Sequence, residues 1–100
     1  MATLHIVSTP TESSSALARC LYAASPGDTV LLIGNGVYCA DATSFERLSS
    51  HGSGLLWFAS ADDVRSRGMA GRLADRVELV DDGGFVDLVV THQPIVSWSA

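Results

Sequence analysis

Two cysteines, Cys20 and Cys39, are the side chains best suited to nucleophilic chemistry. A reactive thiolate needs exposure and a positive environment, such as a nearby cation or the amino end of a helix. Cys20 falls late in an expected helix, at its negative end, and borders the apolar face of that helix. Cys39 follows an expected strand, at an edge where we expect an exposed thiol, although nothing beside it is an obvious activator. Local physics favours a structural role for both cysteines, less strongly for Cys39.

No other residue pattern indicates a cofactor or a metal. The three histidines, His5, His51 and His92, have no metal-ligand spacing with one another or with the cysteines, and a zinc site needs about four ligands. Gly34-x-Gly36 lacks the third glycine and the long helix of a dinucleotide fingerprint. We therefore predict neither a metal nor a cofactor, and we expect the histidines to be hydrogen-bonded or exposed.

The run from Thr29 to Ile33 is the clearest secondary-structure signal in the sequence. It is apolar and rich in β-formers, and Gly34-Asn35-Gly36 ends it. Unbroken apolar strands are typical of parallel sheets that helices cover on both faces. A Gly-Asn-Gly break permits positive φ and a close backbone approach. In open α/β sheets, ligands gather at this end of the strands.

Strands and helices alternate along the whole chain. Further strands are expected at residues 4–7, 55–59, 77–80 and 95–98. The expected helix starts are a Thr9 cap with Pro10 in the first turn, a Thr43 capping box and a Ser60 cap. Such alternation predicts a single α/β domain over residues 1–100, with a mostly parallel sheet of four to five strands.

The run from Phe85 to Val90 gives two conflicting signals. Its β-propensity favours a strand. However, Phe85, Leu88, Val89 and His92 recur at the i, i+3, i+4 and i+7 positions of a helix face. We predict a helix that ends before Pro94.

Composition limits the possible partners. The chain is 47% hydrophobic with a mean hydropathy of +0.27, which fits either buried subunit interfaces or a well-filled core. Trp98, near the end of the chain, must pack on its own domain or on a partner. The net charge is −5, with six arginines and no lysine. We therefore expect no direct nucleic-acid binding, and a mixed solvated surface where arginines and acids interleave at residues 62–78.

Cysteine usage and hydropathy indicate a compartment. The chain has no CxxC motif, no charged and apolar leader at its start and no apolar run of ~18 residues. These features predict a cytoplasmic protein without a membrane span.

Several blocks in order along the chain resemble the DsrH/TusB family. They are Leu4-His5-Ile6-Val7, Pro26-Gly27-Asp28, Val30 to Ile33 with Asn35 to Tyr38, Ser66 to Met69, Val80 to Leu88, His92 and Ser97-Trp98. The resemblance implies a three-layer DsrE-like fold and a cytoplasmic heterohexamer with TusC-like and TusD-like subunits. In the TusB branch, persulfide sulfur passes toward 2-thiouridine at the tRNA wobble position. The principal sulfur-carrying cysteine there belongs to the TusD-like subunit, which makes this chain mainly a structural and binding partner. From the apolar composition and Trp98, we further expect the isolated chain to self-associate or to behave poorly.

The family contains a second branch, in which DsrH-like subunits serve sulfur oxidation. A cysteine in the first helix is typical of that branch, and Cys20 matches its position, although part of the family lacks it. Cys39 matches no family position, and Asn35 stands where the family usually has Asp. Family position thus ranks Cys20 first as a persulfide candidate, and Cys39 second. A third hypothesis is an unrelated module that binds a small ligand at the Gly-Asn-Gly edge.

Overall fold

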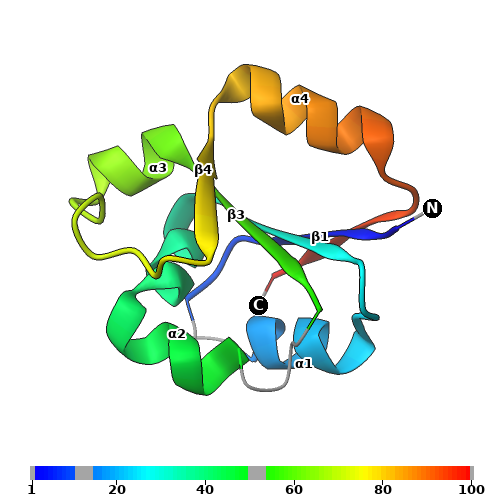
Figure 1. Ribbon diagram of the computed structural model, residues 1–100, viewed down its shortest axis with the longest axis horizontal. Coiled ribbons are helices and arrows are strands. Elements are labelled where there is room, and N and C mark those ends of the chain that lie inside the picture. The colour runs from blue at the N-terminus through cyan, green and yellow to red at the C-terminus, as the bar shows by residue number, and fades with distance from the viewer. Residues whose placement is uncertain (1, 11–14, 50–53, 100) are drawn as a thin grey trace.

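Five parallel strands form the centre of the protein, which a computed structural model describes over residues 2–10, 15–49 and 54–99 (Figure 1). The strand order is β4-β3-β2-β1-β5, and every neighbouring pair is parallel. The predicted α/β architecture and strand number are confirmed. The strands are β1 (Leu4–Val7), β2 (Thr29–Leu32), β3 (Leu56–Ser60), β4 (Val77–Val80) and β5 (Ile95–Trp98).

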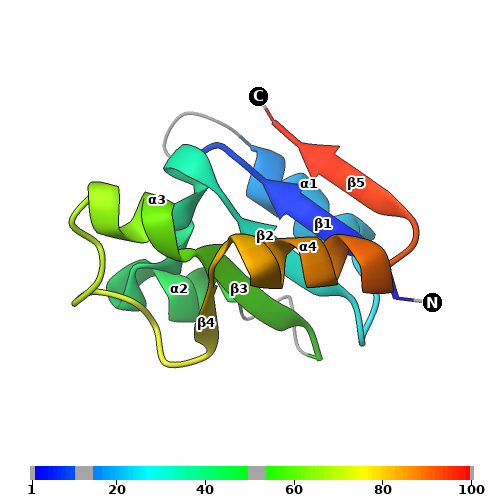
Figure 2. The ribbon, with the colours of Figure 1, turned by 90° about the horizontal axis from the view of Figure 1, so that it is seen from above.

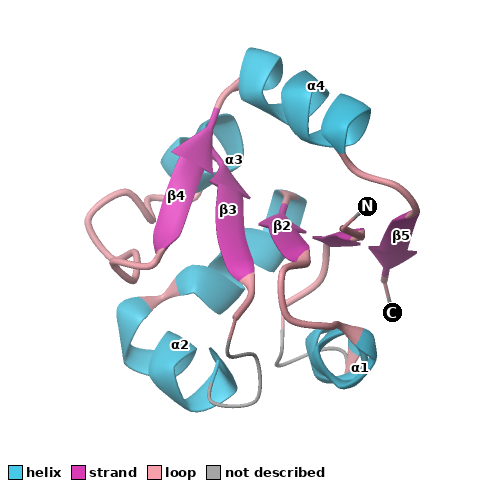
Figure 3. Ribbon diagram, turned by 45° about the vertical axis from the view of Figure 1, so that its right-hand side comes forward, coloured by secondary structure: helices cyan, strands magenta, loops and turns pink. Residues whose placement is uncertain are grey.

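Helices lie on both faces of this sheet (Figures 1 and 3). One face carries α1 and α2, and the opposite face carries α4, which Figure 2 shows from above. The β1–α1–β2 connection moves along the sheet in one direction and β4–α4–β5 moves back, so right-handed crossovers place α1 and α4 on opposite faces. The helices are α1 (Ala16–Ala23), the 3₁₀ helix η1 (Gly34–Ala40), α2 (Ala42–Ser49), α3 (Ala61–Ser66) and α4 (Asp82–Thr91).

The two faces of the sheet are covered unequally. All four residues of β2 are buried, as its unbroken apolar run predicts. The main core lies between the sheet and α1 and α2, where Trp57 packs edge-on against Phe45 with ring centroids 4.9 Å apart. On the α4 face, Leu56 is 57% exposed and Phe58 is half-buried. The start of β3 is therefore uncovered on this face, because α4 does not extend over it.

Two expected helix starts differ from those of the structure. The first helix begins at Ala16 rather than next to Thr9, and residues 11–14 of the expected capping box lie outside the described residues. The second begins at Ala42, where Asp41 rather than Thr43 acts as the cap and accepts a hydrogen bond from the backbone N–H of Thr43 at 2.8 Å. The Ser60 cap and the helical reading of residues 85–90 are confirmed.

The Gly-Asn-Gly break begins η1, which the sequence did not predict. Gly34 has φ +52°, as the break predicts. A Cβ on Gly36 would lie 2.2 Å from the carbonyl oxygen of Val7, so η1 sits directly against the end of β1. Because η1 packs this closely against β1, the segment that follows Gly36 lies under the sheet, and Cys39 is part of that segment.

Candidate functional site

Cys20 lies on the buried face of α1. The helix places Ala16, Leu17, Cys20 and Leu21 against the sheet, and the exposed fraction of Cys20 is 0%. Burial in apolar surroundings, with a smaller contribution from the Asp28 carboxylate, raises the pKa of the Cys20 thiol to about 12. The thiol is therefore protonated at neutral pH and is a poor nucleophile in this conformation.

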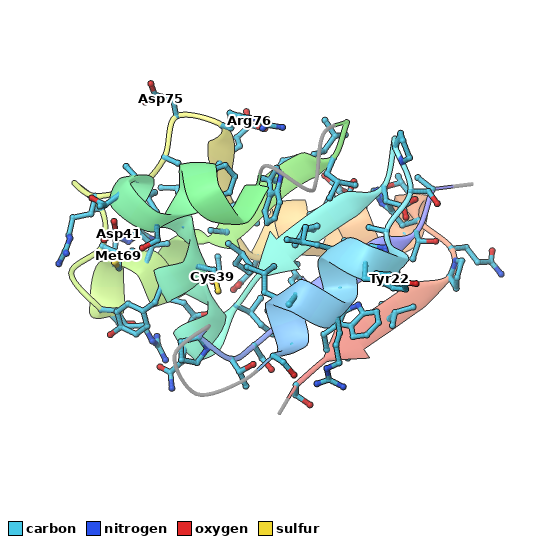
Figure 4. All side chains as sticks on the ribbon, turned by 90° about the horizontal axis from the view of Figure 1, so that it is seen from below. Tyr22, Cys39, Asp41, Met69, Asp75 and Arg76 are labelled. Carbon is cyan, nitrogen blue, oxygen red and sulfur yellow. The ribbon has the colours of Figure 1, made fainter. Side chains whose placement is uncertain are left out.

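Cys39 is also buried, with an exposed fraction of 2%. Its Sγ donates to the backbone oxygen of Thr9 at 3.7 Å, and Figure 4 shows it in the interior, near η1 and α2. The expectation of an exposed thiol is wrong because η1 folds back under the sheet instead of leading outward. Both cysteines belong to one hydrophobic core, and no disulfide joins them.

A chain of hydrogen bonds links β5, β1 and the turn before β2. The indole Nε1–H of Trp98 donates to Nδ1 of His5 at 3.0 Å. An indole N–H can only donate, so Nδ1 of His5 carries the lone pair and Nε2 carries the proton. Nε2 therefore donates to Oδ2 of Asp28 at 3.0 Å. The contact is therefore a hydrogen bond from an imidazole N–H to a carboxylate oxygen.

Asp28 gathers three donors. Besides His5, the backbone N–H groups of Thr3 and Ser25 each donate to its carboxylate at 3.0 Å. Burial alone would raise the pKa of Asp28, but the hydrogen bonds from Ser25, His5 and Thr3 outweigh it and lower that pKa. Three sequence blocks that carry the family resemblance thus meet in one network, and Trp98 packs on its own domain.

His92 forms a second network at the end of α4. Its Nδ1 donates to the backbone oxygen of Leu88 at 2.8 Å, because a carbonyl can only accept. Its Nε2 lies 2.8 Å from Oγ1 of the fully buried Thr29, and this contact ties α4 to β2. The expectation of hydrogen-bonded histidines is confirmed for His5 and His92, and His51 lies outside the described residues. Within the described ranges, no group of three His, Cys, Asp or Glu side chains is arranged to hold a metal.

The carboxyl edge of the sheet is closed by a polar cluster that the sequence reasoning missed. The Asp63 carboxylate accepts from Gly34 N–H at 2.8 Å and from Arg67 Nη1 at 3.2 Å, while Arg67 Nε donates to Asn35 Oδ1 at 2.9 Å. The Gly34 hydrogen bond is the main reason that the pKa of Asp63 is lowered. The i,i+4 spacing of Asp63 and Arg67 was the available signal.

Arginines and acids interleave on the surface as predicted. Arg65 pairs with Asp62 at 2.8 Å, and Arg72 pairs with Asp41 at 3.3 Å. These pairs, with Arg67–Asp63, leave no broad cationic face over residues 62–72.

Several large apolar side chains are exposed on the surface and take part in none of the networks described above. On α4, Val86 is 56% and Val90 is 72% exposed, and none of the ten residues of this helix is buried. Tyr22, on the α1 side of the molecule, is 95% exposed (Figure 4). An apolar helix that buries none of its residues is typical of a chain that associates with another protein.

No described helix is long and apolar enough to cross a bilayer.

Comparisons with known proteins agree with the fold and with the resemblance. The model of the family described as DsrH like protein matches residues 10–95. Proteins named TusB from Yersinia pestis (strain Pestoides F) and Yersinia pseudotuberculosis (serotype O:1b) are each 32% identical over 84 residues, which cover 82% of this chain and 86% of each relative. The crystal structure of the ychN protein from E. coli superposes with a TM-score of 0.71 at 14% identity, over 97% of this chain and 99% of that chain, and confirms the DsrE-like fold. The chain belongs to the DsrH/TusB family.

Proposed function

We propose that this protein is a non-catalytic binding subunit of a cytoplasmic sulfur-relay complex. Its partners are TusC-like and TusD-like chains, and the complex passes persulfide sulfur toward 2-thiolation of the tRNA wobble uridine. Support comes from membership of the DsrH/TusB family and from the relatives named TusB, which match most of this chain. Membership also removes the hypothesis of an unrelated ligand-binding module.

The burial of both thiols is the observation that carries the non-catalytic role. Sulfur transfer needs a thiolate that can meet a donor persulfide, but Cys20 and Cys39 are 0% and 2% exposed. The raised pKa of Cys20 adds a chemical obstacle to the steric one. A TusD-like partner would therefore supply the sulfur-carrying cysteine, and this chain would supply binding surface.

The runner-up function is a DsrH-like subunit of a sulfur-oxidation complex that carries sulfur on Cys20. The position of Cys20 in α1 favours it. For that chemistry, α1 must move from the sheet, or a partner must open the core and supply positive charge. A Cys20 persulfide detected by mass spectrometry in the native complex would favour this function over the proposed one.

Co-expression tests the proposed assembly. The chain is produced with and without the TusC-like and TusD-like chains of the same organism, and the mass of each product is measured by light scattering. We expect the isolated chain to self-associate or to aggregate. Co-expression should instead give one larger complex that contains all three chains. A monodisperse monomer that binds neither the TusC-like nor the TusD-like chain would contradict the proposal.

A further inference from the structure

The outer side of α4 combines apolar and acidic side chains in one strip. Val86 and Val90 are four residues apart, so they are neighbours on the helix surface, and both are more than half exposed. Asp82 lies one turn before Val86, and Asp87 lies one turn before Val90. We call these four residues the α4 strip.

The inner side of α4 is only loosely packed. Phe85, Leu88 and Val89 face the sheet side of the helix at i, i+3 and i+4, yet each is only half-buried. A hollow of about 190 Å³ lies beside the start of the helix, and its lining includes Val80, Phe85 and four aspartates, at positions 62, 63, 81 and 82. The helix is thus an incomplete outer layer in the isolated chain.

A second hollow lies near the edge of the sheet, beside the starts of β3 and β4. It has a volume of about 470 Å³ and lies over β3 and β4, where its lining includes Leu56, Phe58, Arg76 and Glu78. Phe58 and Glu78 are register partners, and Leu56 lies on the same side of β3 as Phe58, while Trp57 and Val77, which also line the hollow, are buried in the core. Leu56 gives this hollow an exposed apolar wall, so apolar surface extends beyond α4 itself.

The charges of the α4 strip indicate what covers it. Among the described residues, neither Asp82 nor Asp87 takes part in a salt bridge, and α4 contains no Lys or Arg. Two copies of the strip packed together would bring four carboxylates to one interface, and like charges across an interface select against that pairing. A different chain with Arg or Lys around an apolar centre would pair these carboxylates.

We propose that the α4 strip is the docking surface for a partner subunit whose facing surface is apolar at its centre and carries Arg or Lys at its rim. The inference rests on the proposed function, because it assigns a surface to the partner of that complex. It also assigns the pairing as one between different chains, not between two copies of this one.

Two substitutions in the strip test the assignment. Val90→Arg puts a long cation into the apolar centre, and Asp87→Arg reverses the charge at the rim. Affinity is measured by titrating the purified TusC-like and TusD-like pair, from the same organism, into each variant. We expect about tenfold or greater weakening for Val90→Arg. For Asp87→Arg, we expect a slower association rate and a smaller dependence of that rate on salt.

Tyr22→Arg is the matched control. Tyr22 is an exposed apolar residue of a helix on the opposite face of the sheet (Figures 1 and 4). We expect its substitution to leave the affinity within about twofold of wild type. Arg is a better helix former than Val, so Val90→Arg should fold normally, and thermal unfolding by circular dichroism verifies this.

The outcomes separate the inference from the proposed function. If the wild-type chain does not bind the TusC-like and TusD-like pair, the proposed function is wrong. If the wild-type chain binds and the folded Val90→Arg variant binds equally well, or if Tyr22→Arg alone weakens binding, the proposed function stands and the α4 assignment is overturned. Self-association of the isolated chain that Val90→Arg abolishes would show that a second copy occupies the strip, and would also overturn the inference.

Discussion

The thiol of Cys20 gives the most direct chemical test at the scale of single residues. Its pKa of about 12 leaves almost no thiolate at pH 8. We expect native Cys20 to react with iodoacetamide about a thousandfold more slowly than an ordinary cysteine, and more slowly still because it is buried. Pulsed alkylation followed by mass spectrometry measures this rate.

The same alkylation in 6 M urea is the control, since unfolding exposes both thiols and should restore ordinary rates. Rapid labelling of Cys20 in the native chain would mean that α1 opens readily. That result would favour the sulfur-carrying alternative.

Asp28 contributes stability that depends on pH. Its pKa is lowered in the folded state, so its contribution is present above the ordinary aspartate value of about 3.9 and is lost as pH falls through the folded-state value. Asp28→Asn at pH 7 should cost about 2 kcal/mol of unfolding free energy, because the donors of His5, Thr3 and Ser25 lose their carboxylate. Urea unfolding at pH 7 and at pH 3 measures the difference.

The cost should shrink at pH 3, because Asp28 of the unfolded wild-type chain takes up a proton below its ordinary pKa of about 3.9, and this favours the unfolded state. Asp75→Asn is the control, because Asp75 is exposed near the start of β4 (Figure 4) and its substitution should change stability by no more than ~0.5 kcal/mol. An equal loss for Asp28→Asn at both pH values would contradict the charge-based explanation.

At the scale of residues, the sequence identified the candidate site residues but not their burial or their hydrogen-bond partners. Cys20 was expected to border the apolar face of a helix, and the structure buries it on that face. The burial of Cys39 depends on η1, which no local pattern indicated. The Trp98–His5–Asp28 chain joins residues 93 and 23 positions apart, and such contacts follow from strand order rather than from spacing along the sequence.

Two glycines give a matched test at the scale of elements. A Cβ on Gly36 would lie 2.2 Å from the Val7 carbonyl oxygen, whereas on Gly83, in α4, its nearest neighbour would be Asp81 Oδ1 at 3.5 Å. Gly36→Ala should therefore destabilise the fold by ~3 kcal/mol, because η1 would be pushed away from β1. Gly83→Ala should stabilise it by about 0.5–1 kcal/mol through helix propensity.

Chemical unfolding of the two variants beside the wild type measures both effects. A Gly36→Ala variant as stable as the wild type would mean that η1 does not sit against β1 as described.

The elements were predicted unevenly, for physical reasons. Strands and α4 were found because apolar periodicity reports burial, and the Phe85, Leu88 and Val89 face is the half-buried one. The start of α1 was placed too early, because the Thr9-Pro10 signal is also compatible with a loop. Whether β3 was covered on both faces could not be read from its sequence, since that depends on how far α4 extends over the sheet.

At the scale of the whole molecule, the negative charge predicts how the chain meets RNA. The net charge is −5, and three of the described arginines, Arg65, Arg67 and Arg72, are paired to carboxylates, so the chain presents few free cations to a phosphate backbone. We expect no measurable tRNA affinity for the isolated chain at physiological salt. Filter binding measures this, and tight, salt-sensitive binding by this chain alone would contradict it.

The proposed function assigns this chain a part in sulfur transfer without a thiol of its own, and removal of both cysteines tests that assignment. Cys20→Ala and Cys39→Ala are combined and expressed in cells whose own copy of the gene is deleted, and the 2-thiouridine content of tRNA is measured by mass spectrometry. Co-purification of the partner chains verifies that the complex still forms. We predict that the doubly substituted chain restores 2-thiouridine as well as the wild type does, because the proposed function assigns the relay cysteine to a partner. Loss of 2-thiouridine with an intact complex would show that this subunit carries sulfur itself.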